Sequence, residues 1–172
     1  MARTTAGVSF DLVTTAATTV VDGLGAQAPL GFKLLVPSSI NDGVSTVNAG
    51  DQTWIYVQNS TGAAWAAGTL VQRTAAALTY QCTISSGAID PARIVGVSQH
   101  AIAAGSFGFI LREGRGLVLC DGNVSADSSI VPDANAGQCT DSAAVTDDAI
   151  GVALATDAGA ASTVAAQLNC LG

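Results

Sequence analysis

Ile94-Val-Gly-Val97, followed by Phe107-Gly-Phe-Ile-Leu-Arg112, is the stretch that decides the fold, because a related pair of segments returns later in the chain. Ala149-Ile-Gly-Val152 repeats the first segment 55 residues on, and Thr163-Val-Ala-Ala-Gln-Leu168 repeats the apolar alternation of the second. Self-similarity at a fixed spacing is the signature of a repeated structural unit. The sequence therefore predicts an internal duplication.

Three further matches extend the repeat in the N-terminal direction. They pair Gln81-Cys-Thr83 with Gln138-Cys-Thr140, Leu70-Val71 with Ile130-Val131, and Ile55-Tyr-Val57 with Leu117-Val-Leu119. Each copy is too small to bury much apolar surface alone, so we expect the two to share one core. We divide the chain into residues 1–50, an N-terminal arm or extra strands; 51–113, the first β repeat; and 114–172, the second β repeat.

The secondary-structure signal is β throughout the repeat. Short apolar runs rich in Val, Ile and Thr alternate with clusters of Gly, Asn, Asp and Ser, at a spacing typical of sandwiches and small barrels. We expect Glu113-Gly114 to close one strand in a tight turn before the next strand begins at Gly116. The expected fold class is all-β, with duplicated small β units forming a compact barrel or sandwich, plus an N-terminal extension or arm. The expected strands are 54–57, 69–72, 80–84, 93–97, 107–112, 116–120, 129–131, 149–154 and 163–168.

Gly96 and Gly151 occupy the same position in the two copies, inside a strand. Glycine weakens a strand and marks a bulge, a bend or a close backbone approach. Its presence in both copies predicts a structural reason, and we expect a sharp bend where the sheet curls over.

The first 50 residues lie outside the repeat. Val8, Phe10 and Leu12 alternate as in a strand, and Phe32-Lys-Leu-Leu-Val36 is a second apolar run that ends at Pro37. Two alternatives remain open for this region: an extra edge strand, or an arm that reaches onto a partner.

The charge and composition limit the classes of partner. The net charge is −7 and the six Lys and Arg residues are dispersed, whereas nucleic-acid binders need a basic footprint and anionic membranes attract basic segments. Charged residues are 11% of the chain, against about 25% in ordinary soluble domains. We expect no direct nucleic-acid or membrane binding, and a bland surface of small residues that is easily ordered against a neighbouring protein.

We expect no cofactor and no metal site. The start of the chain lacks the apolar core of a signal peptide, so we expect synthesis in a cytosol, where thiols stay reduced. Cys82, Cys120, Cys139 and Cys170 form no CxxC pair, and His100 is the only histidine. Small buried apolar residues are the expected role of the four cysteines.

Enzyme chemistry is not indicated by the residues present. Ser98 and His100 are two residues apart and would share a strand face, but a nucleophilic site also needs an orienting acid and an oxyanion hole. Asp147-Asp148 is typical of a solvated turn. We therefore predict no catalytic residues and a protein that is not an enzyme.

Three residues are candidates for an interface. Trp65 lies in a loop of small residues, where it either folds back onto the core or anchors a partner. Arg112 and Arg115 flank the expected turn, where they either pair with acidic groups of a partner or face solvent.

The run from Ile94 to Gly114 resembles bacteriophage capsid cement or decoration proteins, as does Ala149–Leu154 followed by Gly159–Leu168. The shared theme is a strand ending in Gly-Val-Ala, a small-residue turn rich in Ala and Gly, and a returning strand; it covers roughly residues 53–169. The resemblance implies a β-rich protein on the outer surface of a phage head, made in the host cytoplasm. It implies that the protein clamps neighbouring major capsid subunits as a homo-oligomer, a trimer or a dimer. It carries no catalytic residues.

The sequence leaves one alternative function open, namely a module displayed on the virion surface that binds a host receptor or a glycan. Such a module would favour exposed aromatic platforms, whereas aromatic residues are only 5% of this chain.

Overall fold

The computed structural model describes residues 29–38, 50–74, 80–87, 91–142 and 149–170. These residues form β-strands and one short 3-10 helix, η1 (Pro91–Arg93), which confirms the expected all-β class. The strands are β1 (Lys33–Val36), β2 (Gln52–Asn59), β3 (Leu70–Arg73), β4 (Gln81–Ile84), β5 (Ile94–Val97), β6 (Phe107–Cys120), β7 (Asn123–Val124), β8 (Ser129–Pro132), β9 (Cys139–Ser142), β10 (Gly151–Ala153), β11 (Asp157–Ala158) and β12 (Ser162–Asn169).

Five strands close a first ring. β2 pairs antiparallel with β6, which pairs with β5, which pairs with β3, which pairs with β4. The ring closes where β4 returns to β2 in a parallel pairing, Gln58 opposite Gln81 and Asn59 opposite Cys82. A closed ring leaves no unpaired edge between its strands, which is how a barrel avoids edge-to-edge association.

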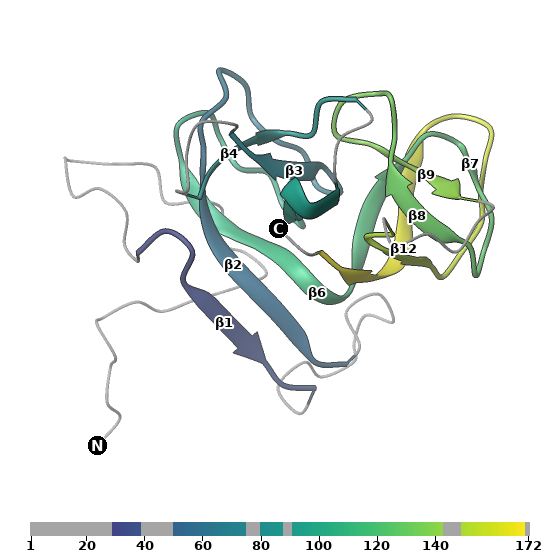
Figure 1. The fold of residues 1–172 in the computed structure, drawn as a ribbon, viewed down its shortest axis with the longest axis horizontal. Helices are drawn as coiled ribbons and strands as arrows, with labels where there is room; N and C mark the ends of the chain where they lie inside the picture. The colour runs from purple at the N-terminus through teal and green to yellow at the C-terminus, as the bar shows by residue number, and fades with distance from the viewer. Residues whose placement is uncertain (1–28, 39–49, 75–79, 88–90, 143–148, 171–172) are drawn as a thin grey trace.

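A second ring repeats this order. β6 pairs antiparallel with β12, then β12 with β10, β10 with β8, and β8 with β9. The ring closes where β9 lies parallel to β6, Cys120 opposite Cys139. The duplicated β units are therefore confirmed, and each closes as a small barrel. The two barrels lie side by side, and β6 runs from one into the other (Figure 1).

One strand is shared where a turn was expected. β6 is continuous from Phe107 to Cys120, so the predicted turn at Glu113-Gly114 is wrong. Gly114 has φ of 107°, and the register against β2 shifts between Thr53 and Trp54, opposite Glu113 and Leu111. The extra residue makes a β-bulge, which bends a strand without ending it. The bend directs the second half of β6 into the second ring.

The glycines of the repeat lie where two backbones approach closely. A Cβ on Gly96 would lie 2.5 Å from the carbonyl oxygen of Leu111, and a Cβ on Gly151 would lie 2.3 Å from that of Gln167. Gly96 also adjoins an irregularity, because β3 pairs Val71 with Gly96 but Gln72 with Ile94. The shared reason for glycine is thus the crossing of the neighbouring strand, β6 in one ring and β12 in the other.

Two apolar clusters fill the fold. The first ring encloses buried side chains from all five of its strands together with Trp65 and Ile102. The other cluster fills the second ring and continues over the outer side of β2 and β6, where Tyr56 packs against Phe109 at 5.0 Å between ring centroids. All four cysteines are buried free thiols, as expected. The first cluster comprises Ile55, Val57, Trp65, Val71, Cys82, Val95, Ile102 and Ile110.

The N-terminal region contributes an edge strand. β1 pairs antiparallel with β2, Leu34 opposite Trp54, and Leu34 packs against the second cluster. Of the two alternatives for this region, residues 33–36 form the extra strand. The predicted alternation of Val8, Phe10 and Leu12 lies outside the described residues.

Candidate interaction surface

Trp65 lies in the core and not on the surface. Its side chain is 1% exposed, and its backbone forms two hydrogen bonds with Ile102, 2.9 Å from N to O and 3.1 Å in return. Of the two alternatives for Trp65, the structure thus shows the side chain folded back onto the core. No indole surface is available to a partner in this conformation.

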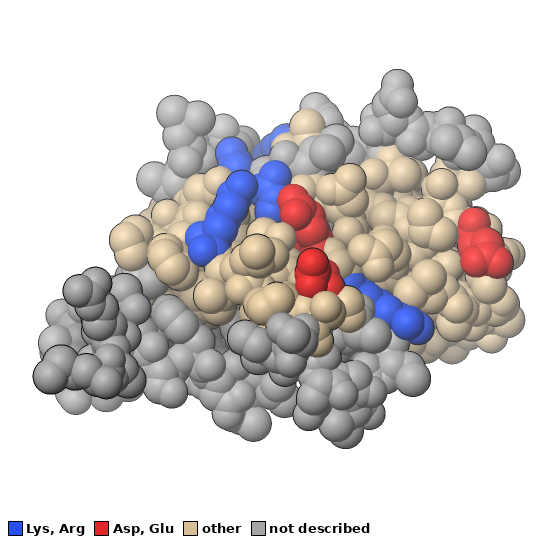
Figure 2. All heavy atoms as spheres, turned by 90° about the horizontal axis from the view of Figure 1, so that it is seen from below, with Lys and Arg blue, Asp and Glu red and all other residues tan. Residues whose placement is uncertain are grey.

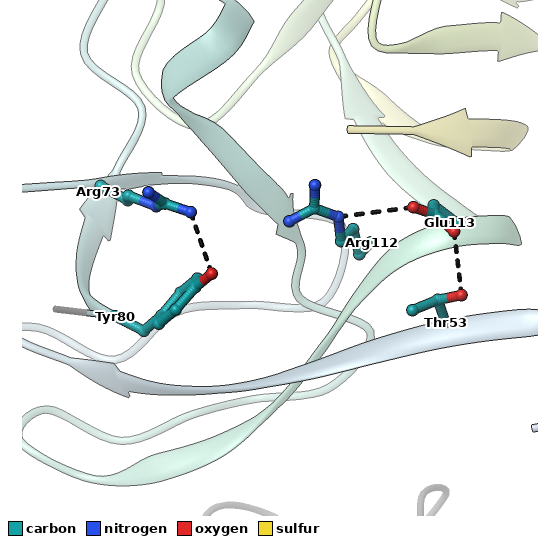
Figure 3. Close-up of polar contacts among 5 residues, drawn as sticks. All are labelled: Thr53, Arg73, Tyr80, Arg112 and Glu113. Carbon is teal, nitrogen blue, oxygen red and sulfur yellow. Dashed lines mark hydrogen bonds and ion pairs between the residues drawn. The ribbon is translucent and has the colours of Figure 1, made fainter. Parts of the chain in front are cut away.

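Arg112 and Arg115 do not flank a turn, because both lie within β6. The side chain of Arg112 is 13% exposed, and its Nε lies 3.6 Å from Oε1 of Glu113. Thr53 Oγ1 donates to the other carboxylate oxygen, Oε2, at 3.0 Å (Figure 3). This network links β2 to β6 beside the bulge. Its Glu113 carboxylate is 46% exposed and so reaches solvent.

Arg115 is half-buried and faces Gln167 of β12. Its Nε is buried and forms no hydrogen bond with a described residue, while its carbonyl accepts from Gln52 Nε2 at 2.7 Å. By contrast, Arg73 donates to Tyr80 Oη at 3.1 Å and stacks over that ring at 4.6 Å (Figure 3). The buried Nε of Arg115 is out of reach of a partner, so only the exposed part of this half-buried side chain is available for contact.

The most exposed apolar side chains were not identified from the sequence. Leu35 is 66% and Phe32 is 41% exposed at β1, and Val152 and Leu154 are 38% and 37% exposed at β10 and just after it. Alternation offered a signal: Leu34 and Ala153 face the core, so Leu35, Val152 and Leu154 must face outward. The exposed apolar side chains therefore lie at two separate places, one at β1 and one at β10, with β2, β6 and β12 between them.

Two rows of paired residues connect these side chains to β6. In the first row, Leu35 lies opposite Thr53, which lies opposite Glu113. In the second row, Val152 lies opposite Gln167, which lies opposite Arg115. Residues directly opposite in antiparallel strands share a face and are in contact. Each row thus has an apolar end and a charged end, and the charged ends are two residues apart on β6. We call Leu35–Thr53–Glu113 the first row and Val152–Gln167–Arg115 the second row.

Charge is sparse on the face shown in Figure 2, where a few basic and acidic side chains lie among uncharged ones. Among the described residues, no group of three or more His, Cys, Asp or Glu could hold a metal ion. No helix in the described part of the chain is long and apolar enough to cross a membrane. The Ser98 hydroxyl donates to the carbonyl of His100, not to its ring.

The fold and surface define a class: an all-β double barrel with an amphipathic surface centred on β6. No model of a known protein family matches the chain, and no curated protein sequence matches it. Among solved structures, it is similar to the N-terminal base of the head fibre protein gp8.5 of bacteriophage phi29. The TM-score is 0.49 at 10% identity, over 67% of this chain and 93% of that one.

Proposed function

We propose that this protein is a structural protein of a phage virion, specifically a capsid cement or decoration protein. In this role it binds the outer surface of the head and stabilises contacts between neighbouring major capsid subunits. The resemblance of residues 94–114 and 149–168 to that family supports the proposal. So does the low content of charged residues, 11%, because weakly charged surfaces cost little to desolvate against a partner.

The observation that carries the proposal is the pair of rows that meet on β6. A protein that clamps two neighbours needs two binding surfaces held at a fixed spacing. Leu35 at the edge of the first ring and Val152 at the outside of the second are held in this way, because both rings are built on one strand. Many copies bound by symmetry then turn modest contacts into tight attachment.

The proposed partner is the major capsid protein of the same phage, without a cofactor and without catalysis. Arg115 supplies a guanidinium at the charged end of the second row, two strands away from Val152, where it can pair with an acidic group of the partner. We further propose a homo-oligomer, a dimer or a trimer, which light scattering of the purified protein tests. The glycan-binding alternative is less well supported, because Trp54 and Trp65 are both buried where a sugar platform would expose them.

The test uses heads of the phage that encodes this chain, assembled without it. Purified protein is added to empty heads, and bound protein is measured by co-sedimentation and imaged by cryo-electron microscopy. We expect saturable density at symmetry-related sites on the outer surface. Leu35→Ser and Val152→Ser should each weaken binding about tenfold or more, because each removes a buried apolar contact at every copy.

Gln81→Ala is the matched control, since Gln81 is exposed and lies outside both rows. It should bind heads like the unaltered protein. Failure of the unaltered protein to bind heads, together with saturable binding to a glycan array, would replace the cement role with the receptor-binding alternative.

A further inference from the structure

Each ring closes at one parallel strand pairing, which we call its seam. The two seams are equivalent in the repeat but carry different side chains. In the first ring, Asn59 of β2 lies opposite Cys82 of β4. In the second ring, Cys120 of β6 lies opposite Cys139 of β9. Cys82 and Cys139 are the same position of the repeated Gln-Cys-Thr segment, so Cys120 stands where the first ring has Asn59.

Hydrogen bonds hold the first seam. The Nδ2 group of the fully buried Asn59 lies within hydrogen-bond distance of three backbone carbonyls, those of Ala63, Ile102 and Ala103, at 2.9, 2.9 and 3.2 Å. These bonds tie β2 to the loops that cap the first ring. The second seam has no comparable amide at Cys120.

Two thiols face one another at the second seam. Cys120 and Cys139 are both fully buried, and their sulfur atoms are 3.5 Å apart. Paired strands are spaced at about 4.8 Å, which lies within the range of Cα separations found in disulfides. The sulfurs need to approach by about 1.5 Å to reach bonding distance, a shift that small side-chain rotations supply.

We propose that Cys120 and Cys139 are a disulfide site that locks the second ring when the protein meets a low-molecular-weight disulfide such as oxidised glutathione. The thiolate of one cysteine attacks a sulfur of the oxidant, forms a mixed disulfide and releases one glutathione thiolate. The second cysteine loses its proton and attacks the protein sulfur of the mixed disulfide. The Cys120–Cys139 bond forms and a second glutathione thiolate leaves. Two protein thiols are oxidised, one oxidant disulfide is reduced, and the two protons pass to the released thiolates.

The closed ring is slow to react, because neither sulfur is accessible to the oxidant. The hydrogen bond with Cys120 and burial both raise the pKa of Cys139 well above its ordinary value, so the reactive thiolate is scarce while the ring is shut. Reaction therefore accompanies folding or the opening of β9, which meets β6 at the Cys120–Cys139 pair. Once formed, the bond closes a loop between residues 19 positions apart.

The experiment refolds the reduced, denatured full chain in parallel with a glutathione redox buffer and with excess reductant. Free thiols are then alkylated, and the protein is cleaved before aspartate residues, which separates Cys120, Cys139 and Cys170. We expect Cys120 and Cys139 in one disulfide-linked pair of peptides, and alkylated Cys82 and Cys170. The thermal midpoint of the oxidised protein should exceed that of the reduced one by roughly 5–10 °C.

The double variant Cys82→Ala/Cys170→Ala keeps the pair and should show the same cross-link and the same shift. Cys139→Ala should show neither. Alkylation of both Cys120 and Cys139 after oxidative refolding, in the parent chain and in the double variant, would overturn the proposal. So would cross-linking of Cys120 to Cys82 or Cys170 as often as to Cys139. The disulfide proposal does not rest on the capsid role, because the cross-link is measured in refolded protein without heads.

Discussion

Buried thiols dominate the chemistry at the scale of single residues. Burial raises the pKa of Cys82 from 9.0 to about 12, although the positive charge of Arg73 partly opposes the shift. Burial likewise raises the pKa of Cys170 to about 12. These shifts mean that the folded chain holds its thiols neutral at pH values where the unfolded chain ionises them. The consequence is a dependence of stability on alkaline pH.

We predict that the free energy of unfolding falls as pH rises from about 9 toward 12, the interval between the unfolded and folded pKa of Cys82. In this interval the unfolded state binds fewer protons, so each pH unit favours unfolding. Urea unfolding under reducing conditions at pH 7, 9 and 10.5 measures the effect. Cys82→Ala lowers stability at pH 7, but between pH 9 and 10.5 it should lose less stability than the parent chain, by about 1–2 kcal/mol. Equal losses in the two proteins would show that Cys82 ionises as readily folded as unfolded.

At the scale of elements, the sequence was most informative where local patterns decide the structure. Alternation and turn residues predicted strands that overlap β2, β3, β5, β8 and β12. The sequence-based prediction was wrong at β6. Glu113-Gly114 has the composition of a turn, but it becomes a bulge through its pairing with β2. The repeat alignment was also one residue out at two strands. Asn59 and Cys120 occupy equivalent positions opposite Cys82 and Cys139, so Val57 corresponds to Val118 and not to Leu119. Val71 pairs with Gly96 as Ile130 pairs with Gly151, so Ile130 corresponds to Val71 and not to Leu70.

We predict that Gly151→Ala destabilises the protein by about 1–3 kcal/mol, because the new methyl group would displace the backbone of β12. The added Cβ would lie 2.3 Å from the Gln167 carbonyl oxygen, and a backbone atom has no rotamer with which to avoid it. Chemical denaturation measures the change. Gly62→Ala is the control, because nothing lies within 4 Å of its Cβ position, and it should be neutral or slightly stabilising. If the two variants were equally stable, the close approach of the neighbouring backbone could not be the reason why both repeats have glycine at this position.

At the scale of the whole molecule, the sequence predicted a shared core but not the way in which it is shared. Ring closure depends on two short parallel pairings, Asn59 with Cys82 and Cys120 with Cys139, between residues far apart in sequence, and no local pattern encodes them. The candidate surface was predicted only in part. Arg115 lies on it, but Leu35 and Val152 were missed because their exposure depends on which strands flank them.

The shared strand predicts that the two rings unfold as one unit. β6 supplies pairing partners to both rings, and Leu111 and Val118 belong to one apolar cluster that spans the junction, so opening either ring removes structure from the other. Trp65 lies inside the first ring, whereas Trp54 belongs to the cluster that spans the junction. Fluorescence of Trp65 in a chain carrying Trp54→Phe therefore reports the first ring, and pulse alkylation of Cys139 under reducing conditions reports the second.

We expect both probes to give the same urea midpoint. Ile55→Val, a change confined to the interior of the first ring, should lower the free energy of unfolding by about 1 kcal/mol. Because the rings are coupled through β6, it should shift both midpoints equally. If the fluorescence midpoint moves while Cys139 stays protected to the original urea concentration, the second ring folds independently. In that case the fixed spacing between Leu35 and Val152 would depend on β6 alone, without the support of a common core.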